Sequence, residues 1–81
     1  MKTKVYVLYD SVTLSSSQLM LARNDEEMIR ILRNSVSRDQ KMSPKDFDLY
    51  FVGEYEDDTM KLTGCVPSKK ENLDNILPEG D

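Results

Sequence analysis

One amphipathic helix in the first half of the chain constrains the fold most strongly. Asn24 is a good N-cap, residues 25–27 place three carboxylates at the positive end of the helix dipole, and Glu27 stands at a capping-box position. Beyond the cap, one face at helical spacing is formed by Met28, Ile29, Ile31, Leu32, Ser35 and Val36. The pattern predicts a helix over residues 25–37 that ends before the Ser43-Pro44 dipeptide.

Four apolar runs flank this helix and predict strands at residues 4–10, 18–22, 46–55 and 59–63. The serines at 15–17 favour a turn or loop, and Asp57-Asp58 is a turn signal that would join the last two strands into a hairpin. Gly53 within the third strand suggests a bulge or a close backbone approach. The order β-β-α-β-β predicts a small α+β domain with a four-stranded antiparallel or mixed sheet.

The end of the chain carries a second capping signal. Ser68 and Glu71, which follow Pro67, have capping-box spacing, and Leu73, Ile76 and Leu77 would line the inner face of a short helix. We therefore expect a single domain over residues 1–67 and a C-terminal extension over residues 68–81, which can form that helix before a frayed tail. With 81 residues, 38% of them hydrophobic, the chain can build one compact core.

The residue inventory argues against an enzyme. The chain has no histidine and one cysteine, Cys65, which excludes Ser-His and Cys-His pairs, an intramolecular disulfide and a four-cysteine zinc site. The acidic cluster at residues 54–58 lacks the spacing of a calcium loop. We expect no catalytic residue, cofactor or metal. The polar start and the lack of a long apolar run predict a cytoplasmic protein without a membrane partner.

A basic helix surface is the first candidate binding site. The net charge is −4, but residues 1–42 hold 7 Lys and Arg against 5 Asp and Glu, whereas residues 43–81 hold 4 against 10. Nucleic-acid phosphates could therefore meet the basic residues of the first half, which are Arg23, Arg30, Arg33, Arg38 and Lys41. The alternative is that these side chains form a solvated helix face with ordinary i,i+3 and i,i+4 pairs.

The aromatic strands supply the second candidate. Alternation places Phe47, Leu49 and Phe51 on one face of the third strand, which we expect to pack under the helix. The opposite sheet face would then show Tyr6, Leu8, Tyr50 and Val52. An apolar surface of this kind indicates an interface. It could be a homodimer contact, a seat for the C-terminal helix, or a platform where tyrosines stack on bases.

Three segments together resemble a known family. VYVLYDSV, LMLARNDEEMIRILRN and SPKDFDLYFVGEYEDD, in this order and spacing, resemble the small nonstructural proteins of microviruses of the gokushovirus branch, which are single-stranded DNA phages. The likeness covers roughly residues 4–67, and members are described as nonstructural, DNA-binding or single-stranded-DNA-synthesis proteins. It implies a non-enzymatic phage accessory protein, acting in the cytoplasm of the infected bacterium around viral DNA replication or packaging.

Two kinds of partner follow from these observations. The resemblance implies single-stranded DNA or the phage replication proteins, although it does not identify contact residues. The apolar face equally suits a protein-interaction module, either a homodimer or a host-factor adaptor, with no nucleic-acid binding.

Overall fold

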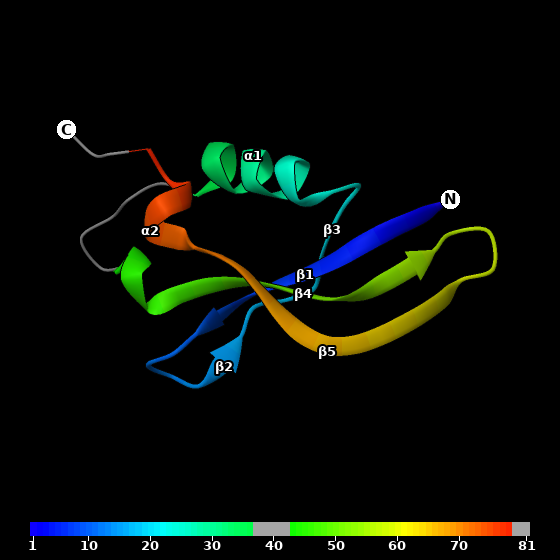
Figure 1. Cartoon of the computed structure of the whole chain (residues 1–81), viewed down its shortest axis with the longest axis horizontal. Helices are drawn as coiled ribbons and strands as arrows, with labels where there is room; N and C mark the ends of the chain where they lie inside the picture. Colours follow the sequence, from blue (N-terminus) through cyan, green and yellow to red (C-terminus); the bar gives the residue numbers. More distant parts are fainter. Residues whose placement is uncertain (37–42, 79–81) are drawn as a thin grey trace.

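An antiparallel sheet carries two helices on one of its faces (Figure 1). The computed structural model describes residues 1–36 and 43–78. In these residues the strands are β1 (Lys2–Asp10), β2 (Ser15–Ser16), β3 (Met20–Ala22), β4 (Phe47–Glu56) and β5 (Lys61–Asn72). The sheet order is β2-β1-β4-β5, and β3 pairs with the other end of the β1 edge. The α+β class is confirmed, but the sheet has five strands rather than four, because Ser15 and Ser16 pair with β1.

Helix α1 (Asp25–Ser35) forms where the capping and periodicity signals predict it. Met28 and Leu32 are buried, and Ile29 and Val36 pack against the core from its edge. Ile31, which we expected on the same face, is 39% exposed. An α-helix turns about 100° per residue, so a buried stripe centred between Leu32 and Ile29 leaves Ile31 on the flank.

The C-terminal part of the chain differs most from expectation. The hairpin strand does not stop near residue 63; β5 continues through the expected boundary at 67/68, and Ser68 and Glu71 lie within it. Helix α2 (Leu73–Ile76) is capped by Asn72, four residues after the predicted cap Ser68, with the Asn72 side chain accepting from the Asp74 backbone N–H. A long ladder to β4 outweighs one local cap, because each paired residue satisfies backbone groups. The expected inner residues Leu73, Ile76 and Leu77 are buried.

The pairing of β1 with β4 decides which side chains enter the core. Tyr6 lies opposite Phe51 and Leu8 opposite Leu49, and directly opposed residues of an antiparallel pair share a face. Phe51 and Leu49 point toward the helices as expected, so Tyr6 and Leu8 do too. Our placement of Tyr6 and Leu8 on the opposite face was therefore wrong. Alternation within each strand was read correctly, but it leaves the match between two strands undetermined.

A bulge beside Gly53 confirms the expectation of a bulge or a close backbone approach at this glycine. Val5 pairs with Gly53 and the next residue, Tyr6, with Phe51, which leaves Val52 as the extra residue. A Cβ atom on Gly53 would stand 2.3 Å from the Thr63 carbonyl oxygen, so the neighbouring strand also approaches closely. The extra residue inverts the alternation beyond it.

Candidate functional site

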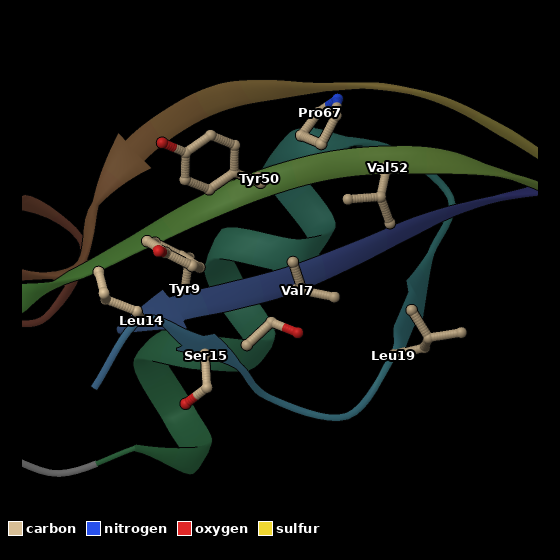
Figure 2. Close-up of a pocket in the computed structure, with 9 residues that line it drawn as sticks. Val7, Tyr9, Leu14, Ser15, Leu19, Tyr50, Val52 and Pro67 are labelled. Carbon is tan, nitrogen blue, oxygen red and sulfur yellow. The ribbon is translucent and has the colours of Figure 1, made fainter. Parts of the chain in front are cut away.

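The sheet face turned away from the helices is apolar and hollowed, and we call it the outer face (Figure 2). Figure 2 looks onto this face, with α1 behind the sheet. One hollow is lined by Val7, Tyr9, Leu14, Ser15, Ser16, Leu19, Tyr50, Val52 and Pro67. A second hollow is lined by Val5, Leu19, Leu21, Tyr55 and Leu62. Because Leu19 lines both, the two hollows form one continuous surface along β1 and β4.

The outer face has a buried floor and an exposed apolar rim. Val5 and Val7 in β1 are 1% and 7% exposed, and Tyr9 packs edge-to-face on Tyr50 with 6.0 Å between ring centroids. The rim consists of leucines that remain largely in water: Leu14 at 72%, Leu19 at 58%, Leu21 at 50% and Leu62 at 56%. Contiguous exposed apolar side chains of this kind are typical of binding surfaces.

The helix-covered face looks different where the helices end. Toward the β4–β5 turn the sheet runs beyond α1 and α2 (Figure 1). Here the residues on the helix side are mostly charged; a shallow hollow is lined by Lys2, Glu54, Glu56, Lys61 and Thr63. The Lys4 ammonium lies 5.8 Å from the centre of the Phe51 ring, at the border with the core. The part of this face that the helices leave uncovered is therefore polar, whereas the outer face is mainly apolar.

The bulge keeps the outer face apolar toward the β4–β5 turn. Before Gly53 the outer residues of β4 are Asp48, which lies opposite Tyr9, and then Tyr50 and Val52. After the bulge it is Tyr55 that faces the same way, beside Val5 of β1. Without the extra residue the alternation would have turned Tyr55 toward the charged side.

Leu14 is held on the rim in an unfavourable backbone conformation. It ends the turn between β1 and β2 with a φ of 57°, a region that costs a residue with a bulky side chain about 1–2 kcal/mol. The turn is fixed by the Asp10 carboxylate, which accepts from the Val12 N–H at 2.9 Å and the Thr13 N–H at 3.4 Å. Nothing in the serine-rich sequence indicated that this leucine belongs to a surface, because its position depends on the turn conformation.

The described arginines of the basic-helix hypothesis, Arg23, Arg30 and Arg33, lie away from the outer face. Arg23 Nε donates to the Glu27 carboxylate at 2.6 Å, and this bond is the main reason that the pKa of Glu27 is lowered. Glu27 also accepts from the Arg23 backbone N–H rather than closing a capping box on Asn24, whose side chain caps the helix by accepting from the Glu27 N–H. Arg33 Nε donates to the Ile76 carbonyl oxygen at 3.1 Å and so ties α1 to α2.

Arg30 is exposed on α1, and its charge, like that of Arg23, helps to lower the pKa of Glu27. Arg38 and Lys41 lie outside the described residues.

Tyr6 has a structural role inside the protein. Its phenol donates a hydrogen bond to the Asp25 carboxylate at the start of α1, and its ring packs edge-to-face on Phe51. Burial, then the bond to Asp25, raises the pKa of Tyr6 well above its ordinary value of 10.0. Asp25 also pairs with Lys70 of β5 at 3.6 Å. Tyr6 therefore joins helix and sheet, and it is not available for stacking on a base.

Comparison with curated proteins and with solved structures gave no match. In the described residues no helix has the length and apolar character of a membrane span, and no group of His, Cys, Asp or Glu side chains is placed to hold a metal ion. A family model described as phage ORF5 protein matches residues 3–75, which include the five described strands apart from Lys2 and most of α2. The chain therefore belongs to the phage ORF5 protein family.

Proposed function

We propose that this protein is a non-enzymatic accessory protein of a gokushovirus-like microvirus and that it works by binding another protein chain through its outer face. It acts in the cytoplasm of the infected bacterium, around replication or packaging of the viral single-stranded DNA. The family match supports a phage protein, and the resemblance of its three segments supports the microvirus setting. The observation that carries the mode of action is the open apolar outer face.

The exposure of the rim leucines gives an approximate free energy that would be gained when a partner covers this face. The exposed parts of Leu14, Leu19, Leu21 and Leu62 add up to about 2.4 whole side chains. At ~1.5–3 kcal/mol per leucine taken fully from water, their burial would provide about 4–7 kcal/mol before the entropy of association is subtracted. The tyrosines add to this gain, whereas the floor valines are already buried in the single chain and add almost nothing. A burial free energy of this size suits a specific contact with another protein.

Single-stranded DNA is the second candidate, because three tyrosines, Tyr9, Tyr50 and Tyr55, lie on the outer face and aromatic rings can stack on bases. The charges favour it less. The described residues that line the two hollows include no lysine or arginine. The described arginines lie at or on α1, on the other side of the sheet, so their positive charge is on a different surface from these tyrosines.

A complementation experiment tests the proposal. A phage that lacks this gene is supplied with the wild type, with Leu19→Glu, or with Met60→Glu, and viral single-stranded DNA and phage yield are measured. Leu19 lines both hollows, whereas Met60 is an equally apolar, 77% exposed residue that lines neither. We expect Leu19→Glu to lower the yield and Met60→Glu to preserve it, with circular dichroism showing that both fold. Full yield with Leu19→Glu would refute the outer face as the working surface.

A binding measurement separates the two candidates. Fluorescence anisotropy of labelled single-stranded DNA is followed at low and moderate salt with the wild type and with Tyr50→Ala. We expect no binding at micromolar protein. Binding that weakens steeply with salt and is lost in Tyr50→Ala would favour the DNA candidate instead.

A further inference from the structure

We infer that the protein on the outer face is a second copy of this chain, so that two molecules associate as a two-fold symmetric dimer, outer face to outer face. The inference rests on the proposed function, since it names the partner of the same surface. Three observations favour a second copy over a different protein or a nucleic acid: the charges, the apolar pattern of the sheet, and the shape of the face.

The absence of charge at the centre suits contact with an identical surface. In a two-fold interface the same patch appears on both sides, so a charge near the axis faces its own copy. Among the described residues, those that line the two hollows include no Asp, Glu, Lys or Arg. The charges at the end of β4 nearest the turn to β5 lie on the helix side. The outer face does carry Asp48, opposite Tyr9, and Lys69, opposite Tyr50, but these two charges pair with each other at 3.5 Å. Two chains with net charge −4 can therefore meet here without an unpaired like charge on the axis.

The apolar pattern is that of a sheet covered on both faces. Outer residues of β1 and β4 stay apolar beyond the end of the helices, while the helix side becomes charged there. Homodimer interfaces are more apolar than transient contacts and resemble a divided protein core. A second sheet, packed about 10 Å away, would supply the layer that is absent from the single chain.

The face also combines a projection with a hollow. Leu14 and Leu19 stand at opposite ends of a floor that includes Val7 and Tyr50 (Figure 2). A rotated second copy can set its rim leucines into the space between them. Association through the free edge of β5 is less suitable, because Pro67 has no N–H to donate and the ladder of β5 is interrupted by two register shifts.

The test is the mass of the protein in solution. Light scattering coupled to size-exclusion chromatography, and sedimentation equilibrium, are run on the full chain from low to high micromolar concentration. We expect the wild type to reach twice the chain mass of 9.4 kDa. Leu19→Glu should stay at one chain mass, with a dissociation constant raised at least 100-fold, and Met60→Glu should behave as the wild type. Leu14→Asn serves as a second outer-face variant if Leu19→Glu does not fold.

The outcomes separate this inference from the proposed function. A wild type that remains monomeric at the highest concentration overturns the second copy as the partner. If Leu19→Glu then still lowers phage yield, the outer face binds another protein and the proposed function stands. A dimer that persists in both outer-face variants places the contact elsewhere and also overturns the inference. A dimer lost in Leu19→Glu, together with normal phage yield, supports the inference while removing the proposed function.

Discussion

Replacing Leu14 with asparagine should change stability and association in opposite directions. Leu14 has a φ of 57°, and asparagine adopts this left-handed region more readily than leucine does. The side chain is 72% exposed in the single chain, so the monomer loses little packing when it is removed. A second molecule that covers the outer face would lose much more.

Both magnitudes follow from the structure. Relief of about 1–2 kcal/mol of backbone strain outweighs the roughly 0.4–0.8 kcal/mol lost with the buried quarter of the side chain. The monomer should gain about 0.5–1 kcal/mol, or ~2–8 °C in Tm. The exposed part is worth ~1–2 kcal/mol in each copy when it is covered. Two copies then lose about 2–4 kcal/mol, so the dissociation constant should rise at least roughly 30-fold.

Met60→Asn is the matched control. Met60 ends the turn between β4 and β5 with a φ of 61° and is 77% exposed, but it lines neither hollow of the outer face. Thermal unfolding is followed by circular dichroism at a protein concentration where the wild type is monomeric, because dimerisation itself raises Tm. Association is followed by sedimentation equilibrium. Both variants should gain stability, and only Leu14→Asn should lose association.

Two results would refute this reasoning. A fall in the Tm of monomeric Leu14→Asn would mean that the leucine packs within the chain more than its exposure indicates. Equal association of wild type and Leu14→Asn would mean that Leu14 is not covered by a second molecule.

Three further predictions concern the frame that supports this face. Gly53→Ala should lower the free energy of unfolding, measured by chemical denaturation, by about 2–3 kcal/mol, because the new Cβ would lie 2.3 Å from the backbone of the neighbouring strand. Gly64→Ala is the control: the nearest atom to its Cβ is 3.9 Å away, so the same measurement should show a change below ~1 kcal/mol. Because folding raises the pKa of Tyr6, the folded state keeps a proton that the unfolded state loses at high pH. The Tm should therefore fall as pH rises above about 10, and it should fall less steeply in Tyr6→Phe. Equal slopes of Tm against pH in the two proteins would contradict this. Arg23→Ala should raise the pKa of Glu27 toward 4.5 in an NMR titration, and an unchanged pKa would show that the pair does not persist in solution.

The local signals in the sequence were sufficient for the main helix and for the face of β4 that enters the core. Helix α1 begins at its Asn24 cap, and Phe47, Leu49 and Phe51 point toward the helices. Capping and periodicity depend on residues within a few positions of one another, so they can be read without knowing the rest of the fold. The apolar character of Tyr50 and Val52 also indicated correctly that a second face needed an explanation.

Contacts between distant parts of the chain decided the composition of that second face. The register of β1 against β4 joins residues at least 37 positions apart, and it turned Tyr6 and Leu8 toward the core and Val7 and Tyr9 outward. A turn conformation placed Leu14 on the rim. Neither feature is encoded in one strand's alternation, because register and turn geometry arise from pairing and packing across the whole sheet. The sequence alone indicated that the sheet has a second apolar face, and the tertiary structure determined which residues form it.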